Sequence, residues 1–305
     1  MCTPSLTDGR FGRRRKTKTM TTVVVTGSAG MLGRQLVAAA PAGCKVIGVD
    51  LADGDLSTPH GVAAAVEGHR PDLVIHAAAW TDVDGCERDP ARAWRMNAIA
   101  TRLVARACRR LRARLVYIST DYVFDGALWR PYVEADLPCP VNVYGETKLA
   151  GELEVARVED HLILRTQWLF GPGRSNFVEA VLKKALGGGP LTVVADQWGC
   201  PTYTVHLAPM VWRAALGGWH GTIHAAGRGV ATWYEVAEAI LEGAGVACKL
   251  LPCSLDDWPS LARRPRYAPL AMDRWRELCG DSAPPWRQGV VEYVRALIRE
   301  EVHAS

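Results

Sequence analysis

Tyr144 and Lys148 are the residues of this chain whose types and spacing most directly predict chemistry. On a helix, residues four apart share one face, so the lysine ammonium would lie beside the tyrosine phenol. A nearby cation lowers the pKa of a phenol from its ordinary value near ~10 and makes it usable as an acid and base near neutral pH. Thr120, in the polar run Ser119-Thr120-Asp121 at the predicted end of a strand, supplies a further hydroxyl. Together these residues predict hydride transfer at a carbonyl or alcohol, whereas the Tyr/Lys pair alone would also fit a helix surface.

A glycine-rich turn near the start of the chain predicts a dinucleotide site. The β-branched run 22–26 leads directly into the turn 27–33, and a helical pattern begins at Arg34. In such a strand, turn and helix, spaced glycines allow a tight turn, close approach of a pyrophosphate and close packing of the helix on the strand. The helix N-terminus then favours the negative charge of the phosphates. The residues predicted to hold the phosphates are Gly27, Gly30, Met31, Leu32 and Gly33.

The second apolar run, 45–49, ends at an acid, Asp50, that is placed to accept hydrogen bonds from the adenosine ribose. A carboxylate there disfavours a 2′-phosphate and favours NADH, but Arg34 could offset its charge, so NADPH and NADH both stay open. We expect the adenine beside Asp55 and Leu56, for which a solvated loop is the alternative. After the third predicted strand, small side chains would let the cofactor pass closely or would serve tight helix packing; they are Ala77, Ala78 and Ala79.

Strand-like and helix-like segments alternate along the chain, which predicts a parallel sheet covered by helices. Further strands are expected at 72–76, 114–120 and 161–165. A long helix is expected from Pro90 to Leu111, because residues there recur at helical spacing: Ala93, Trp94, Asn97, Thr101, Val104 and Cys108. The predicted fold class is α/β: a Rossmann-type doubly wound parallel sheet with a smaller interleaved C-terminal substrate-binding lobe. We assign residues 21–168 to the dinucleotide-binding domain and residues 169–305 mainly to the lobe, with segments that return to the sheet.

The composition favours a cytoplasmic enzyme without a metal. No apolar run reaches the ~18 residues of a membrane-spanning helix, so no membrane partner is expected. The nine cysteines are scattered without a Cys-x-x-Cys pair, which favours reduced thiols in the cytoplasm. The eight histidines do not cluster with them at the spacing of metal ligands.

The first 20 residues contain six of the basic residues and one acid, so the net charge of +4 belongs to this segment. It lacks the apolar stretch of a signal peptide. We predict that residues 1–20 are a basic, disordered tail, for which Met20 is an alternative start. A nucleic-acid-binding arm is the other interpretation, but the segment has few aromatic residues, and no nucleic-acid partner is expected.

The ordered set of motifs resembles the extended short-chain dehydrogenases and, within these, the dTDP-4-dehydrorhamnose reductases. The most specific motif is Ser-Thr-Asp-Tyr-Val-Phe-Asp-Gly at 119–126; the others lie at 27–33, 76–84, 144–152 and 165–171. The resemblance implies an NADPH- or NADH-dependent reductase acting at C4 of a nucleotide-linked 4-keto-6-deoxy sugar.

The same resemblance implies a role for each matching residue. Tyr144 would protonate the alkoxide, and Lys148 would lower the pKa of that phenol and bind the nicotinamide ribose. Thr120 would hydrogen-bond the substrate carbonyl. The remaining implied contacts are Asp121 to a sugar hydroxyl, Trp168 in the sugar pocket and Thr81 beside the cofactor.

Some positions depart from the family pattern. Gln35 replaces a glutamate that helps to bind magnesium between subunits in some relatives, so a homodimer bridged by magnesium is not expected. Ala268 and Trp80 replace a common serine and a common Tyr or His, which leaves the sugar open. Two other functions stay open: a nucleotide-sugar epimerase, and a non-catalytic dinucleotide-binding subunit similar to the β subunit of methionine adenosyltransferase.

Overall fold

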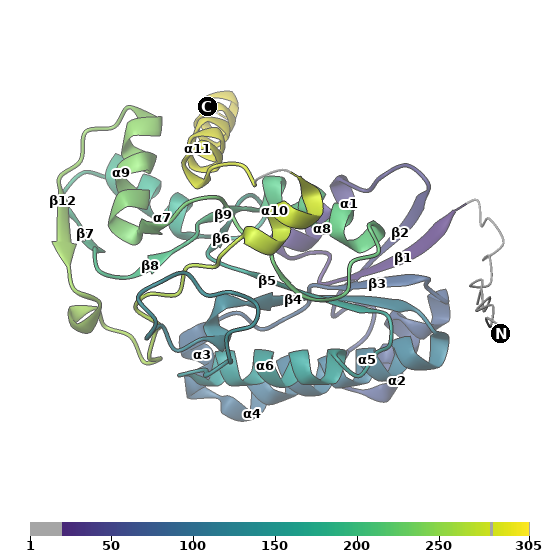
Figure 1. Cartoon of the computed structure of the whole chain (residues 1–305). Coiled ribbons are helices and arrows are strands. Elements are labelled where there is room, and N and C mark those ends of the chain that lie inside the picture. The colour runs from purple at the N-terminus through teal and green to yellow at the C-terminus, as the bar shows by residue number, and fades with distance from the viewer. Residues whose placement is uncertain (1–19, 281–282, 305) are drawn as a thin grey trace, which may run out of the picture.

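A parallel six-stranded sheet forms the centre of the molecule (Figure 1). The computed structural model describes residues 20–280 and 283–304, so residues 1–19 of the predicted tail lie outside the described residues. The predicted Rossmann-type sheet is confirmed. Its strands, in spatial order, are β2 (Cys44–Val49), β1 (Thr21–Thr26), β3 (Leu73–His76), β4 (Arg114–Thr120), β5 (His161–Thr166) and β10 (Gly221–His224).

The order of the strands in the sheet indicates where a ligand would bind. β1 pairs with β2 on one side and with β3 on the other, so the strand order reverses direction between β1 and β3. In open parallel sheets, ligands bind in the crevice beyond the carboxyl ends of the strands at such a switch point. The glycine turn follows β1, and residues 77–79 follow β3, so both are at this crevice.

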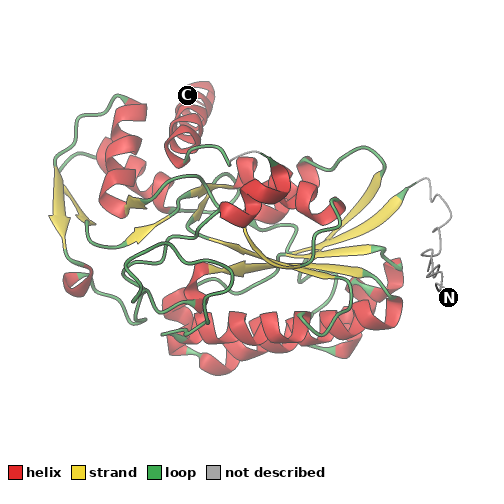
Figure 2. Ribbon diagram, in the orientation of Figure 1, coloured by secondary structure: helices red, strands yellow, loops and turns green. Residues whose placement is uncertain are grey.

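Helices cover both faces of the sheet (Figure 2). Alternate residues of β1 face opposite sides: Val23 and Val25 pack in one core and Val24 in the other. The first core also takes residues from α1 (Met31–Ala38), α8 (Thr204–Leu216) and α10 (Asp273–Cys279). The second takes residues from α2 (Pro59–Ala65), α5 (Ala100–Leu111) and α6 (Val143–Val155).

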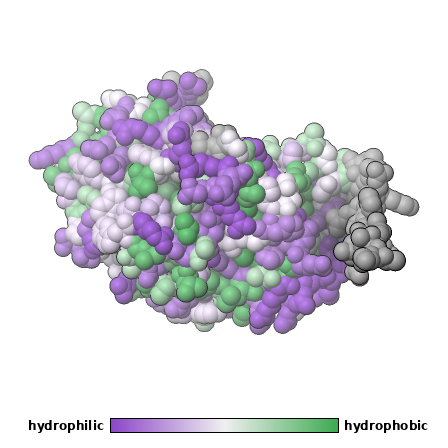
Figure 3. Space-filling model, in the orientation of Figure 1, coloured by the Kyte–Doolittle hydropathy of each residue, from purple (hydrophilic) through white to green (hydrophobic). Residues whose placement is uncertain are grey.

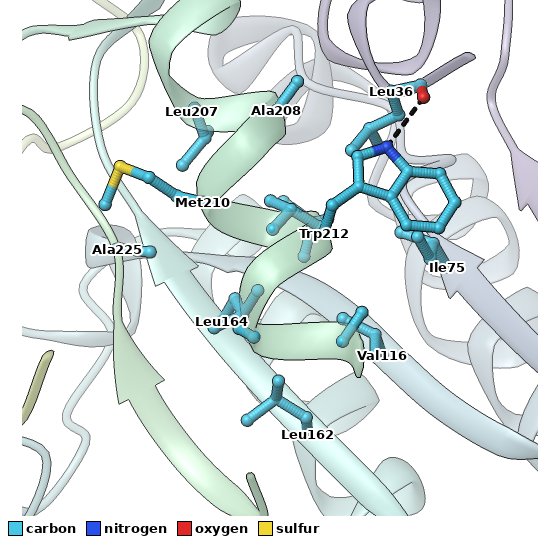
Figure 4. Close-up of a cluster of buried hydrophobic side chains, with 14 of the residues drawn as sticks. Leu36, Ile75, Val116, Leu162, Leu164, Leu207, Ala208, Met210, Trp212 and Ala225 are labelled. Carbon is cyan, nitrogen blue, oxygen red and sulfur yellow. Dashed lines mark hydrogen bonds between the residues drawn. The ribbon is translucent and has the colours of Figure 1, made fainter. Parts of the chain in front are cut away.

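Trp212 of α8 shows how the first core accommodates a polar group (Figure 4). Its indole is 3% exposed, and its Nε1 donates a hydrogen bond of 2.8 Å to the carbonyl oxygen of Leu36 in α1. A buried polar group that keeps a partner avoids the desolvation penalty. This contact joins α8, which comes late in the chain, to the helix that begins at the glycine turn.

A smaller lobe has its own core, built around Phe170, Val178, Ile240 and Tyr293. Its helices are α7 (Phe177–Leu186), α9 (Trp233–Ala244) and α11 (Trp286–Ala304). The chain returns to the main sheet through α8 and β10, as the predicted interleaving requires. The boundary after residue 168 remains a prediction, supported by these separate cores. Short strand pairs complete the lobe and its junction: β6 (Leu169–Phe170) with β9 (Thr202–Tyr203), β7 (Leu191–Val194) with β12 (Leu250–Cys253), and β8 (Trp198–Gly199) with β11 (Ala231–Thr232).

The predicted helix from Pro90 to Leu111 is helical throughout but not uniform. It consists of α4 (Pro90–Ala93), a π-helical stretch η2 (Trp94–Ile99) and α5. Of the residues that recur at helical spacing, Trp94 is 42% exposed, and the others are buried: Ala93, Asn97, Thr101, Val104 and Cys108. The remaining elements are the 3₁₀ turns η1 (Glu67–His69), η3 (Asp121–Val123) and η4 (Leu255–Asp257) and the helix α3 (Val83–Arg88).

On the face seen in Figure 3, hydrophobic residues form small patches among hydrophilic ones. Within residues 20–280 and 283–304, no helix combines the length and the apolar character needed to cross a membrane.

Candidate active site

A cavity of about 960 Å³ lies at the predicted crevice. This volume is in the range of cofactor and small-molecule sites. Every residue that the sequence predicted for cofactor, substrate or catalysis lines it: Gly27, Gly30, Met31, Leu32, Gly33, Asp50, Asp55, Leu56, Ala77, Ala78, Ala79, Thr81, Thr120, Asp121, Tyr144, Lys148 and Trp168.

The glycine turn is too closely packed for side chains. Gly27 has a φ of +69°, and a Cβ built on it would lie 2.8 Å from the backbone of Ala78. A Cβ on Gly33 would lie 2.0 Å from the carbonyl oxygen of Gly27. The helix that follows, α1, has Gly30 as its N-cap and no side-chain cap. Its first N–H groups can therefore bind the oxygens of a phosphate.

Asp50 connects the end of β2 to the glycine turn. Its Oδ2 accepts from the backbone N–H of Ala29 at 2.9 Å, and its Oδ1 accepts from that of Leu51 at 2.9 Å. Arg34, which the sequence suggested as a counter-charge for Asp50, donates from Nε to the carbonyl oxygen of Ala29 at 3.0 Å. Asp50 therefore supports the turn as well as facing the cavity.

Tyr144 and Lys148 lie one turn apart on α6, as predicted. The helix begins at Asn142, whose side chain accepts from the N–H of Gly145 at 2.8 Å. The Lys148 Nζ donates to the carbonyl oxygen of Ile118 at 2.8 Å and lies 4.1 Å from the centre of the Tyr117 ring. Both contacts orient the ammonium by charge: a carbonyl dipole and an aromatic face each attract a cation.

The Thr120 hydroxyl lines the cavity together with Tyr144 and Lys148. It acts to lower the pKa of the Tyr144 phenol, against the larger effect of burial, and it donates to Oδ1 of Asp121 at 3.0 Å. The Nε2 of Gln167 donates to the other oxygen of Asp121 at 2.7 Å. Gln167 also donates to the carbonyl oxygen of Ala268 at 2.9 Å, which anchors the late segment of the chain beside the site.

The expected lowering of the Tyr144 pKa is not found, and this prediction was wrong. Burial of the phenol raises its pKa well above the ordinary value, and the nearby Asp121 raises it further. Burial also lowers the pKa of Lys148 to about 7, against which Glu152 acts. The spacing argument considered the ammonium but not the desolvation of both groups, which dominates when a site is fully buried. The resting phenol is therefore neutral, which is the form that can donate a proton.

A buried ion pair fixes the elements behind the lysine. Glu152 of α6 accepts from Nε and Nη2 of Arg165 in β5, at 2.9 and 2.7 Å. The Ser119 hydroxyl of β4 donates to the same carboxylate at 2.6 Å. Three elements of the site therefore meet at one carboxylate, which limits their relative movement.

An aromatic pair forms part of the cavity wall. The rings of Trp168 and Trp233 stack with their centres 3.7 Å apart and their planes at 8°, and both line the cavity. Trp168 has a φ of +47°, a conformation that is uncommon and strained for a tryptophan. A Cβ on Gly199 would lie 2.5 Å from the Trp168 ring, so Gly199 makes room for it.

Sequence reasoning missed Trp233, and it placed Asn97 on the helix from Pro90 to Leu111 without giving it a role in the site. Thr232 and Glu235 form a capping box, a pattern that signals the start of α9 but not the position of Trp233 beside Trp168. Asn97, in the π-helical stretch, accepts from the N–H of Trp80 at 2.7 Å and donates to Thr147 of α6 at 3.1 Å. Asn97 thereby joins the loop that contains Trp80 to α6, the helix that carries Tyr144. The local sequence gives no signal for either contact.

Among the residues that the structure describes, no group of three His, Cys, Asp or Glu side chains is arranged to hold a metal ion.

The chain is similar in sequence and in structure to several reductases. dTDP-4-keto-6-deoxy-D-glucose reductase from Streptomyces niveus is 38% identical over 258 residues, which cover 83% of this chain and 90% of that protein. dTDP-4-dehydrorhamnose reductase from Burkholderia thailandensis is 36% identical over 296 residues, which cover 91% and 99%. The structure of dTDP-4-dehydrorhamnose reductase from Bacillus anthracis in complex with NADP matches with a TM-score of 0.87 and 34% identity, over 90% of this chain and 98% of that one.

These relatives confirm the resemblance that the motifs indicated. The RmlD substrate binding domain family matches residues 20–299, which include the glycine turn, the Tyr144 helix and most of the lobe. The chain therefore belongs to the RmlD substrate binding domain family.

Proposed function

We propose that this protein is an NAD(P)H-dependent reductase of the C4 keto group of a dTDP-4-keto-6-deoxy-hexose, as in dTDP-L-rhamnose or related deoxysugar biosynthesis. The observation that carries the proposal is that Thr120, Tyr144 and Lys148 line one cavity, which also contains the glycine turn. The named reductases among the relatives support the same reaction.

The residues present fit a dinucleotide. The glycine turn forms a cradle that a single Cβ would fill, and the uncapped N-terminus of α1 faces the same cavity. Asp50 would accept from the adenosine ribose, Asp55 and Leu56 would flank the adenine, and residues 77–79 and Thr81 would border the rest of the cofactor. When bound, the reduced nicotinamide supplies the hydride.

The chain's own residues would donate the proton and stabilise the negative charge that develops on the substrate oxygen. Thr120 would hydrogen-bond the substrate carbonyl, and Tyr144, held neutral by burial, would give its proton to the alkoxide oxygen. Lys148 would bind the nicotinamide ribose and balance the charge left on the phenol. Asp121 and Trp168 would hold the sugar, and the strained backbone of Trp168 supports a binding role.

Incubation with dTDP-4-keto-L-rhamnose and either NADPH or NADH tests the proposal, with the product identified by NMR. We expect oxidation of the cofactor and an alcohol at C4. An epimerase would instead purify with bound dinucleotide and need no added cofactor. Co-purification with a synthetase, and no turnover of any keto-sugar, would indicate a regulatory subunit.

Asp50→Ala tests the cofactor preference. The variant should bind NADH about tenfold more weakly, because a hydrogen bond to a charged group is worth roughly 1.5–3 kcal/mol. NADPH should lose less, since its 2′-phosphate does not gain from that carboxylate. Fluorescence titration of both cofactors measures the ratio.

Asp53→Ala is the matched control for this substitution. Asp53 accepts from the N–H of Asp50 at 2.8 Å, so its loss perturbs the same strand end without removing the ribose acceptor. Equal losses for NADH and NADPH in Asp50→Ala would mean that Asp50 only supports the turn through Ala29.

We also propose a cytoplasmic location and a nucleotide-sugar rather than a nucleic-acid partner. Free thiols support the first point: the cysteines within residues 20–280 and 283–304 form no disulfide. If the protein forms a homodimer, Gln35 argues against a magnesium bridge between subunits.

A further inference from the structure

Lys148 is a buried cation whose ammonium makes few polar contacts with the protein. The residue is 3% exposed, and its Nζ donates to the carbonyl oxygen of Ile118 at 2.8 Å. Among residues 20–280 and 283–304, the ammonium has no other hydrogen bond and no ion pair. An ammonium has three N–H donors, so two remain for a ligand in the cavity that Lys148 lines. A charge buried in this way is costly unless an opposite charge lies near it.

Glu152 is placed to supply that opposite charge. It follows Lys148 by one turn of α6, so the two side chains share a face of the helix. Both reach the same strand, β4: the ammonium contacts Ile118, and the carboxylate accepts from the hydroxyl of the next residue, Ser119, at 2.6 Å. Glu152 is 4% exposed, and in a buried site a charge acts strongly over such a separation without direct contact.

The other titratable groups around the ammonium do not replace this charge near neutral pH. His76 of β3 is neutral, because burial and the lysine charge lower its pKa to about 3. Burial raises the pKa of Tyr117 in β4 and of Tyr144 in α6 well above the ordinary value, so both phenols are neutral. Asp121 lines the same cavity, and burial raises its pKa to about 7, so it is only partly ionised.

Arg165 of β5 fixes the position of the Glu152 carboxylate. Its Nε and Nη2 donate to the two carboxylate oxygens at 2.9 and 2.7 Å, and Ser119 supplies a third hydrogen bond. A bidentate contact of this kind is strong and directional. Neither Glu152 nor Arg165 lines the cavity, so the carboxylate is held behind the ammonium and does not occupy its free N–H groups.

We propose that Glu152, held by Arg165, is a positioning residue that keeps the Lys148 ammonium charged and leaves its N–H groups free for the cofactor ribose and the phenol. The consequence for turnover rests on the proposed function, in which Lys148 takes part. The charge of the lysine in the cofactor-free protein does not rest on it, so the two can be tested separately.

NMR titration of cofactor-free protein labelled with ¹³C at the lysine Cε measures the charge of Lys148 directly; its signal is the one absent from Lys148→Met. The wild-type midpoint is expected near pH 7, which is the lowered pKa of the buried lysine. Glu152→Gln should lower the midpoint by about one pH unit, because an opposite charge is lost. Arg165→Gln should raise it, because a cation is removed and the released carboxylate can turn toward the ammonium. Glu146→Gln, at an exposed position of α6, is the matched control and should leave it unchanged.

A double variant keeps the test valid if either single variant fails to fold, since one partner of a buried ion pair is poorly tolerated alone. Glu152→Gln combined with Arg165→Gln leaves neither charge unpaired. Its midpoint should also lie below that of the wild type, but by less than in Glu152→Gln. A wild-type midpoint in the variants that lack Glu152, or a lower midpoint in Arg165→Gln, would overturn the inference.

The pH dependence of kcat/KM is the second measurement, because it reports the charge of the free enzyme. Glu152→Gln should lose about tenfold at pH ~8 but only about twofold at pH ~6, where the lysine of both proteins holds most or half of its charge. An equal loss at every pH would mean that Glu152 only supports the fold, and would overturn the inference. If the midpoints shift as expected but the wild type reduces no dTDP-keto-sugar, the proposed function fails while the assignment of Glu152 stands.

Discussion

Replacing Tyr144 with phenylalanine should lower the turnover of the keto-sugar by about 10²–10⁴-fold, which is the typical contribution of a general acid. The substitution keeps the ring that packs with Cys86 and Ala93 but removes the proton that would be given to the alkoxide. The affinity for NADPH should be nearly unchanged. Steady-state rates at saturating substrate, together with fluorescence titration of the cofactor, measure the two quantities.

Tyr122→Phe is the matched control for this variant. The Tyr122 ring lies edge-on to that of Tyr144 with 5.5 Å between their centres, and its hydroxyl accepts from Nη1 of Arg264 at 3.1 Å. It therefore loses a hydroxyl from the same wall of the cavity without losing the proposed acid. Near-normal turnover in Tyr144→Phe, or an equal loss in both variants, would contradict the role given to Tyr144.

Replacing Lys148 with methionine should have two opposite effects. Turnover should fall by about 10²–10³-fold, the usual result of removing one preorganised electrostatic contact. The melting temperature of the cofactor-free protein should rise, because an ammonium that is 3% exposed is replaced by an apolar side chain of similar length. A gain in stability with a loss of activity is the expected signature of a residue retained for function.

The gain in stability should depend on pH. Burial lowers the Lys148 pKa from 10.5 to about 7, so between these values the unfolded chain holds the proton and the folded chain does not. The stability of the wild type should therefore rise with pH across this window, and below about pH 7 the full penalty of burying the charge is present. Lys148→Met should gain most near pH ~6 and progressively less toward pH ~10.

Thermal unfolding of both proteins over this pH range measures the effect. Lys45→Met, at an exposed position of β2, serves as the control and should change the melting temperature little. A lower melting temperature in Lys148→Met at every pH would mean that the lysine supports the fold.

The parts of the fold and site that could be predicted from the sequence depend on local chemistry. The β-branched run before Gly27 and the three glycines after it specify a strand and a turn by backbone sterics alone. Tyr144 and Lys148 share a face because any helix places residues four apart together. Residues that follow parallel strands meet at one edge, which is why the separately predicted motifs line one cavity.

What could not be predicted depends on contacts between distant segments. Trp233 stacks on Trp168 although the two residues are far apart in the sequence. A pattern within one segment cannot predict which distant segment will pack against it. The direction of the Tyr144 pKa shift depends on burial by several elements, which outweighs the neighbouring ammonium.

Transfer of deuterium from the cofactor to the sugar tests the central claim most directly. The protein would be incubated with dTDP-4-keto-L-rhamnose and NADPH or NADH that carries deuterium at the transferable position of the nicotinamide, and the product examined by NMR. We predict deuterium at C4 of the sugar and one cofactor oxidised for each sugar reduced. An unreduced sugar, or a product whose C4 carries no deuterium, would contradict the proposal that this cavity reduces a 4-keto sugar by hydride transfer.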